Sequence, residues 1–246
     1  MEIIDNFKSL TTKNGHSVIR ILSGRSNVFL LTNGEKNILI DTSPQRLWNK
    51  LEKNLTCLNI KHIDYLILTH SHFDHAGNAH GIREKYKASV IIHREEAPYL
   101  ETDNFIIPQG TNLFSKAIVY LLANKLTPKP GCKPCQCDIL VDTRFDLNDF
   151  GFNAYILHTP GHSPGSVSVI IDDEIAVVGD TMFGVFKRSV FPPFAQDTVK
   201  MVQSWGILLE TNCSVFLPSH GSLNSRQLVQ KDYNRRIKKY YLLYVG

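Results

Sequence analysis

The stretch Thr69-His70-Ser71-His72-Phe73-Asp74-His75 places three histidines and one aspartate within six consecutive positions. It follows the apolar run 63–68, which we interpret as a buried strand. Since residues i and i+2 of an extended segment point the same way, His70 and His72 could share one ion and leave Asp74 and His75 to a second. Neutral imidazole and carboxylate suit zinc, and also iron or manganese. A surface histidine cluster is the alternative, but the density of this group favours a metal site.

Three later positions extend this candidate site. His162, Asp180 and His220 each lie just beyond a predicted strand, at 154–158, 174–178 and 215–217 respectively. Loops held by rigid strands often carry functional residues. We therefore expect these side chains to join the histidine-rich stretch.

Together these residues resemble the signature of the metallo-β-lactamase superfamily, which is His-x-His-x-Asp-His followed by a distant His, an Asp and a final His. All seven positions are matched, and the resemblance extends roughly from Val18 to Gly221. It implies an α/β fold, a four-layer αββα sandwich, with the metal site at one edge.

The resemblance also implies how the ligands are divided. His70, His72 and His162 would bind a first divalent ion, and Asp74, His75 and His220 a second. Asp180 would bridge the two ions, with a hydroxide between them, and Asp74 would also act in catalysis by orienting the nucleophile and moving a proton. The ions would be zinc, with iron or manganese as alternatives. Residues that hydrogen-bond to the ligands without touching the ions, here called outer partners, should fix the histidine tautomers. The nearest polar candidates are Asp41, Thr69, Thr159 and Ser219.

Departures from better-known branches narrow the substrate. Asp180 occupies the position where one class of true metallo-β-lactamases has cysteine, which favours a thioester, lactone or phosphodiester hydrolase. His72 is not glutamate, which argues against flavodiiron oxygen reductases. Only 26 residues follow His220, too few for the helical domain of classical glyoxalase II, although a shorter thioesterase stays open. Acyl-homoserine lactonases place a tyrosine shortly after the bridging aspartate, and the run Asp180-Thr181-Met182-Phe183 lacks it.

Composition bounds the class of protein. The chain has 246 residues, 20% charged residues and a net charge of +4, as expected of a globular protein without a dominant basic surface. No stretch approaches the ~20 apolar residues of a membrane span, and the acidic N-terminus does not resemble a signal peptide. We expect a cytoplasmic protein with a small-molecule substrate and no membrane partner. Nucleic acid is not an expected partner, and a homodimer is possible.

Periodicity and turn residues predict one domain over 1–246, with an insertion at about 94–137 that could roof the site. We predict strands at 18–22, 28–32, 36–41, 63–68, 89–92, 139–141, 154–158, 166–171, 174–178 and 215–217. Asn33-Gly34 predicts a hairpin turn. Predicted helices cover 44–51 with Ser43 as the cap, 77–86, 112–125, a segment capped by Asp197 that ends near Thr211, and a basic helix over 225–242.

Two further features bear on function. The aromatic loop after Asp180 could form an apolar pocket wall for substrate, or could simply pack, and its members are Phe183, Phe186, Phe191 and Phe194. Cys132, Cys135 and Cys137 form Cys-x-x-Cys-x-Cys, which suits a structural metal, a reversible disulfide or free thiols.

The leading hypothesis is a dinuclear metallohydrolase that cleaves a small ester, thioester or lactone. The alternatives are a phosphodiesterase or nuclease, and a redox or metal-sensing protein that uses the three cysteines.

Overall fold

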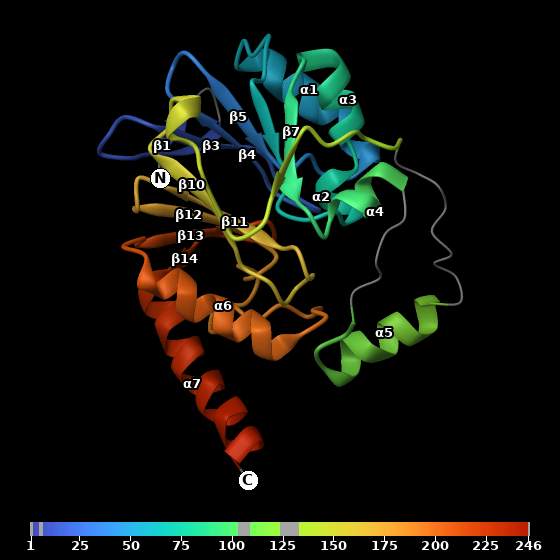
Figure 1. The fold of residues 1–246 in the computed structure, drawn as a ribbon, viewed down its shortest axis with the longest axis vertical. Coiled ribbons are helices and arrows are strands. Elements are labelled where there is room, and N and C mark those ends of the chain that lie inside the picture. Colours follow the sequence, from blue (N-terminus) through green and yellow to red (C-terminus); the bar gives the residue numbers. More distant parts are fainter. Residues whose placement is uncertain (1, 5–6, 103–108, 124–132, 246) are drawn as a thin grey trace.

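The fold is built on two β-sheets, shown in Figure 1. The computed structural model describes residues 2–4, 7–102, 109–123 and 133–245. The first sheet has its eight strands in chain order: β1 (Glu2–Ile4), β2 (Phe7–Thr11), β3 (Ser17–Leu22), β4 (Val28–Thr32), β5 (Asn37–Ile40), β6 (Tyr65–Ile67), β7 (Ser89–His93) and β8 (Ile139–Val141). Strands β1 to β5 pair antiparallel, and β5 to β8 pair parallel. The parallel half brings the carboxyl ends of β5 and β6 to one edge.

The second sheet has six strands in the order β14-β13-β12-β11-β10-β9. Their bounds are β9 (Arg144–Asp146), β10 (Ala154–His158), β11 (Val167–Ile171), β12 (Ile175–Gly179), β13 (Val215–Pro218) and β14 (Asn224–Ser225). All neighbours pair antiparallel except β12 and β13, which are parallel. Strands β10, β12 and β13 end just before His162, Asp180 and His220.

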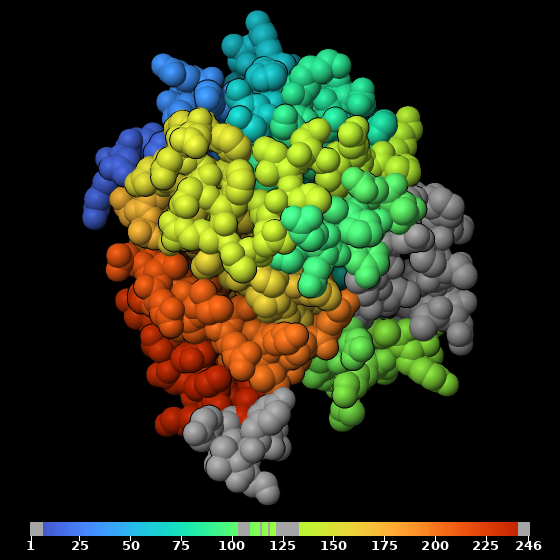
Figure 2. Space-filling model, viewed as in Figure 1, coloured from blue at the N-terminus to red at the C-terminus, as the bar shows by residue number. Residues whose placement is uncertain are grey.

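Helices cover the outer face of each sheet, which gives four layers. Helices α1 (Trp48–Cys57), α3 (Ala79–Tyr86) and α4 (Ala97–Thr102) belong to the first half, with η1 (Gln45–Leu47) and α2 (Phe73–Ala76) beside them. Helices α6 (Thr198–Glu210) and α7 (Arg226–Val245) cover the second sheet, and α5 (Leu113–Ala123) lies to one side (Figure 1). Figure 2 shows α6 in orange and α7 in red at the bottom of the molecule, with the first-half helices at the top.

Three apolar cores separate the layers, because side chains alternate along a strand. Leu39 of β5 packs with Leu51 and Ile82 of the first-half helices. Its neighbours Ile38 and Ile40 face Val169 and Val177 of the second sheet, among others. Beyond that sheet, Trp205 of α6 packs with Phe216 of β13 and Val229 of α7. This arrangement confirms the predicted αββα sandwich.

The predicted strands are all present among the described residues, and β4, β8 and β10 have the predicted bounds. Strands β1, β2, β9 and β14 are additions that periodicity did not reveal. Strand β9 lies at the edge of its sheet, where Arg144 and Asp146 stay exposed, so its sequence lacks a strand's usual apolar content. The hairpin at Asn33-Gly34 is confirmed by the antiparallel pairing of β4 with β5.

Two helix predictions need correction. Ser43 does not cap a helix: its backbone has a φ of 64°, and its hydroxyl instead hydrogen-bonds with Ser26 Oγ at 3.2 Å. The helix predicted at 77–86 begins as α3 at Ala79, and a separate turn, α2, precedes it. Asp74 and His75 therefore lie in a helical turn, which forms because the backbone N–H groups of His75 and Ala76 both donate to His72 O at 2.9 Å.

No helix within the described residues is long and apolar enough to cross a membrane. Of the predicted insertion at 94–137, the described parts are 94–102, 109–123 and 133–137, and they contain α4 and α5. Thr111 joins this segment to the aromatic loop through its N–H, which donates to Pro193 O at 2.9 Å. The single-domain organisation stays a prediction.

Candidate metal centre

The seven predicted ligand residues meet at one edge of the sandwich. Four of them follow β6 of the first sheet, and the other three follow β10, β12 and β13 of the second sheet. Imidazole nitrogens and carboxylate oxygens form three groups whose ligand atoms lie within 4.8 Å of one another. The groups are His70, His72 and His162; His70, His75 and Asp180; and Asp74, His75 and His220. The first and last of these match the two ligand sets that the resemblance implied.

The group of His70, His72 and His162, called the first trio, lies deep in the molecule. His70, His72 and His162 are at most 5% exposed. Nδ1 of His72 is 3.1 Å from Nε2 of His162, although the two residues are 90 positions apart in the chain. Ligands held about 2.1 Å from one tetrahedral ion would be separated by roughly 3.4 Å, so this spacing suits a shared ion.

The group of Asp74, His75 and His220, called the second trio, lies nearer the surface. His220 Nε2 is 3.7 Å from Asp74 Oδ2, and His75 Nε2 is 3.9 Å from Asp74 Oδ1. The side chains of His220 and Asp74 are 16% and 13% exposed, whereas His75 is fully buried. A substrate that enters from solvent would therefore meet the second trio first.

Asp180 stands between the two trios. Its Oδ2 lies 3.3 Å from His220 Nε2 and 3.5 Å from His162 Nε2, and its Oδ1 lies 3.6 Å from His75 Nε2. Gly179 before it has a φ of 54°, and a Cβ there would lie 2.8 Å from Thr69 Cβ. A glycine at 179 thus lets the strand end approach the histidine-rich loop and present the carboxylate.

Asp41, just after β5, fixes the tautomers of two histidines. Its Oδ2 accepts hydrogen bonds from His75 Nδ1 at 2.9 Å and from Ser219 Oγ at 3.0 Å, and its Oδ1 accepts one from the Thr69 amide at 2.8 Å. Thr69 Oγ1 also donates to this carboxylate, at 2.9 Å from Oδ2, and so can accept from His70 Nδ1 at 3.1 Å. Both rings then carry their proton on Nδ1 and turn a bare Nε2 into the site.

The other expected outer partner, Thr159, does not contact a ligand. Its hydroxyl pairs with Ser168 Oγ at 2.8 Å. The first trio instead depends on a backbone group, because His162 Nδ1 donates to Phe194 O at 2.9 Å. This directs Nε2 of His162 inward as well.

The electrostatics favour neutral nitrogen ligands in the first trio. Burial lowers the pKa of His70, His72 and His162, and nearby histidines lower it further for His70 and His72; for His72 the pKa falls to about 3. For His75 and His220 burial acts in the same direction, but nearby carboxylates together outweigh it and raise the pKa. These are Asp180 and Asp41 for His75, and Asp180 and Asp74 for His220. Without metal these two rings neutralise the buried acid, and metal binding would displace their protons.

The same charges keep Asp180 ionised. Burial alone would raise its pKa, but His220, His75 and His162 together lower it well below the ordinary value. The site therefore has a buried carboxylate available between two sets of imidazoles.

Unpartnered polar atoms show that this donor set suits metal ions. Among the described residues, the buried side-chain atoms without a hydrogen-bond partner include His70 Nε2, His72 Nε2, His75 Nε2 and Asp180 Oδ1. Leaving such an atom without a hydrogen bond costs about 1–3 kcal/mol of folding stability, so four such atoms close together would destabilise the fold considerably. Divalent ions would satisfy His70 Nε2, His75 Nε2 and Asp180 Oδ1, since nitrogen and carboxylate oxygen are ligands for zinc, iron and manganese. His72 faces His162 with its other nitrogen, Nδ1.

Several residues that support the site carry no sequence signal. Ser26 Oγ donates to the backbone carbonyl of Asp74 at 2.5 Å, and the backbone N–H of Asn27 donates to Ser219 O at 2.6 Å. The β3–β4 loop therefore contacts both segments that carry the second trio. Arg25 in the same loop has Nε 3.6 Å from Asp74 Oδ2 and its side chain half exposed. Glu96, a fully buried acid, contacts the loops of the first trio.

The four phenylalanines of the aromatic loop have different surroundings. The ring of Phe183 is 4.6 Å from that of His220, and Phe186 is 48% exposed. The ring of Phe191 lies 6.0 Å from that of Trp205, and the guanidinium of Arg236 lies over it at 3.6 Å from its centre, which favours a packing role. Phe194 contributes its carbonyl to His162. A substrate role for these rings stays a prediction.

The cysteines do not form a disulfide among the described residues. Cys135 is buried and Cys137 is half-buried, both are free thiols, and Cys132 lies outside the described residues. Burial raises the pKa of Cys135 to about 11 and that of Cys137 to about 12. Thiols with such pKa values hold few thiolates at neutral pH and react slowly.

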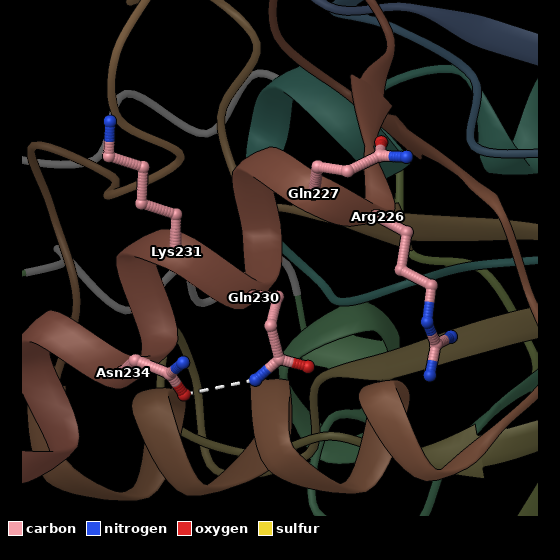
Figure 3. Close-up of a pocket in the computed structure, with 5 residues that line it drawn as sticks. All are labelled: Arg226, Gln227, Gln230, Lys231 and Asn234. Atoms are coloured by element: carbon pink, nitrogen blue, oxygen red, sulfur yellow. Dashed lines mark hydrogen bonds between the residues drawn. The ribbon is translucent and has the colours of Figure 1, made fainter.

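A polar hollow of about 540 Å³ lies on helix α7, apart from the seven predicted ligand residues. Its lining, shown in Figure 3, consists of Arg226, Gln227, Gln230, Lys231 and Asn234. The guanidinium of Arg226 already donates to the carbonyls of Thr211 and Cys213, at 2.8 and 2.9 Å, just after α6. Arg226 therefore has a structural role that does not require a ligand in this hollow. The predicted ligand residues make the stronger candidate site.

Comparison with known proteins agrees with this geometry. The sequence profile of the metallo-beta-lactamase superfamily matches residues 23–220. The chain belongs to the metallo-beta-lactamase superfamily. The matched segment contains all seven predicted ligand residues.

Three similar proteins illustrate the range of this superfamily. The chain is 30% identical over 205 residues to the probable metallo-hydrolase MJ0888 of Methanocaldococcus jannaschii, with 82% of this chain and 90% of the relative covered. It is 28% identical to the hydroxyacylglutathione hydrolase GloC of Haemophilus influenzae, with 83% and 90% covered. Among solved structures, that of TTHA1623 in a di-iron-bound form has 25% identity and a TM-score of 0.60, with 84% of this chain and 93% of that chain covered.

Proposed function

We propose that this superfamily member is a dinuclear metallohydrolase that cleaves small thioesters, esters or lactones. The observation that carries the proposal is the position of Asp180, within 3.6 Å of histidines from both trios. A carboxylate placed there can hold two ions at once, which a site with one trio does not need. The solved relative with two bound irons supports the same number of ions.

The chain's own residues would divide the work. His70, His72 and His162 would hold one ion, Asp74, His75 and His220 the other, and Asp180 both. Two bound divalent ions would supply a water that ionises near neutral pH and would polarise the substrate carbonyl. Asp74, at the more exposed trio, would orient that water and accept its proton.

The surroundings of the second trio favour a substrate with both apolar and anionic parts. Phe73 is 46% exposed, and Arg25 has its guanidinium 5.8 Å from the centre of that ring. Phe183 contributes a ring beside His220. A small acyl group attached to an anionic carrier would suit these neighbours. One relative is named as a hydrolase of hydroxyacylglutathione, in which an acyl group is attached to a larger carrier.

Arg25 also keeps a phosphodiesterase as the second candidate, because a cation beside the second trio suits a phosphate as well as a carboxylate. A protein that senses redox state or metal through Cys132, Cys135 and Cys137 is less well supported. The described thiols are largely covered, and burial raises their pKa values.

The test is a substrate screen on protein loaded separately with zinc, manganese and iron. Substrates should include acyl thioesters, lactones, aryl esters, bis-nitrophenyl phosphate and a chromogenic β-lactam. We expect the highest kcat/KM on a thioester, ester or lactone, and loss of that activity after chelation. Two bound ions per chain with no hydrolysis of any substrate would refute the proposal, and activity confined to the phosphodiester would favour the second candidate.

A matched pair of histidine variants controls this screen. His72→Ala removes a ligand of the first trio and should abolish hydrolysis. His62→Ala removes a histidine whose side chain is 58% exposed and should leave kcat/KM unchanged. Equal activity of both variants would show that the seven-residue site is not the catalytic site.

A further inference from the structure

Glu96 is a buried acid that the proposed reaction does not use. It lies in the turn between β7 and α4, and its backbone carbonyl accepts hydrogen bonds from the N–H groups of Tyr99 and Leu100 in the first turns of that helix. Its residue is 0% exposed, and no lysine or arginine is bonded to its carboxylate among the described residues. An acid is seldom buried in this way without strong hydrogen-bond partners.

The carboxylate of Glu96 joins the two loops that carry the first trio. Its Oε2 accepts hydrogen bonds from the amide of Ser71 at 2.9 Å and from the hydroxyl of Ser71 at 2.5 Å. Its Oε1 accepts one from the amide of Gly165 at 3.0 Å. Ser71 lies between His70 and His72, and Gly165 lies three residues after His162. The Glu96 side chain therefore links a loop of the first sheet to a loop of the second, next to the first trio.

Gly165 is shaped for this contact. A Cβ at that position would lie 2.7 Å from Glu96 Cγ and 2.8 Å from His93 Nδ1, closer than real Cβ atoms approach. The glycine therefore lets the 159–166 loop come near enough for its amide to reach the carboxylate. If the carboxylate were lost, the three donor groups on Ser71 and Gly165 would be buried without this acceptor.

The second trio is held by a different acid. Asp41 contacts His75 directly and reaches Ser219, the residue before His220. Within the described part of the chain, neither Ser71 nor Gly165 hydrogen-bonds to Asp41, and Glu96 makes no hydrogen bond to Asp74, His75 or His220. The two trios thus depend on separate carboxylates, except where Asp41 also reaches the first trio through Thr69.

We propose that Glu96 is a positioning residue for the first metal site, which holds the His70–His72 loop and the His162 loop at the separation that one ion requires. The inference rests on the proposed dinuclear function. It predicts that loss of the Glu96 carboxylate weakens metal binding at the first trio selectively. A residue that only stabilises the fold would weaken both sites alike.

The experiment is a titration of metal-free protein with cobalt(II), followed by visible absorption and calorimetry. His162→Ala and His220→Ala identify the spectral signals of the first and second sites. Glu96→Gln keeps the shape of the side chain but sets an NH₂ group against donors from Ser71 or Gly165. Glu95→Gln is the matched control, because Glu95 is the exposed acid next to it in the same turn.

For Glu96→Gln we expect the first-site Kd to rise about 10- to 100-fold, the range typical of outer partners of metal ligands, with the second-site Kd nearly unchanged. Glu95→Gln should match the wild type at both sites. Ser71→Ala removes only the hydroxyl arm and should give a smaller loss in the same direction, which keeps the test usable if Glu96→Gln does not fold.

The outcomes separate this inference from the function on which it rests. Wild-type protein that binds fewer than two ions would refute the dinuclear proposal and the inference with it. Two ions in the wild type, with unchanged or equally weakened sites in Glu96→Gln and Ser71→Ala, would refute the role of Glu96 alone.

Discussion

At the scale of single residues, Asp180 has the most demanding position. Its carboxylate approaches His162 of one trio and His75 and His220 of the other, and it is only 6% exposed. A group that serves two ions should be needed by both, whereas Asp74 belongs to one trio only.

We therefore predict that Asp180→Ala weakens the binding of both ions, and that Asp74→Ala weakens that of only one. Each loss should exceed the roughly 10- to 100-fold effect of an outer partner, since a direct ligand is removed. Metal content after dialysis, measured by elemental analysis, distinguishes the two variants. Retention of either ion at wild-type affinity in Asp180→Ala would show that the carboxylate does not bridge.

The seven predicted ligands could be recognised from the sequence because metal chemistry restricts residue types and because four of them are neighbours in the chain. Glu96 could not be recognised in this way. Its partners Ser71 and Gly165 are 25 and 69 positions away, and a lone glutamate in a turn has no distinctive pattern. The same holds for Phe194: its ring type predicts a place in a pocket wall, whereas its backbone carbonyl makes the contact with His162.

At the scale of secondary-structure elements, helix α6 begins at the N-cap that its sequence predicts. Asp197 was predicted as its cap, and its Oδ1 accepts hydrogen bonds from the amides of Val199 and Lys200, both at 3.0 Å. The same residue reaches the first trio's loop, because its own N–H donates to Gly161 O at 2.9 Å. Capping is local in the sequence and could be predicted, but this second contact depends on tertiary structure.

We predict that Asp197→Ala lowers the free energy of unfolding by about 1 kcal/mol, the usual cost of losing an N-cap. Asp197→Asn should lose much less, since its amide oxygen can accept the same two hydrogen bonds. Urea denaturation followed by circular dichroism measures both values. Equal stability of the alanine variant and the wild type would mean that the cap contributes nothing to the fold.

Element bounds were least predictable where tertiary contacts override local preference. Ser43 before Pro44 suggested a cap, but the chain there takes a left-handed turn toward Ser26. Strands β2 and β9 do not follow from the sequence pattern because β2 has only one buried residue and β9 has none. By contrast, β12 is a continuous buried run and β10 begins with alternating buried and partly exposed residues, patterns that sequence analysis detects well.

At the scale of the whole molecule, the site lies across the boundary between the two sheets. Loops after the first sheet supply His70, His72, Asp74 and His75, and loops after the second supply the remaining three ligands. Patterns in the residues alone could indicate two groups of strands and a dense motif, whereas the division into trios that combine residues from different loops followed only from the family resemblance. Because each trio contains ligands from both sheets, a bound ion would join the two halves of the sandwich.

We therefore predict that metal binding stabilises the entire fold and not only the loops. At a free metal concentration of about 100 times Kd, each ion should add about 2.7 kcal/mol, which corresponds to a rise in Tm of roughly 5–10 °C for a chain of this size. Calorimetry of protein with zinc, and with zinc removed by a chelator, measures the shift. Magnesium is the control, since it prefers oxygen ligands and should give a much smaller shift. Asp74→Ala should keep part of the zinc effect, because the first trio stays intact, whereas a zinc effect absent from the wild type would mean that neither trio binds metal in the folded protein.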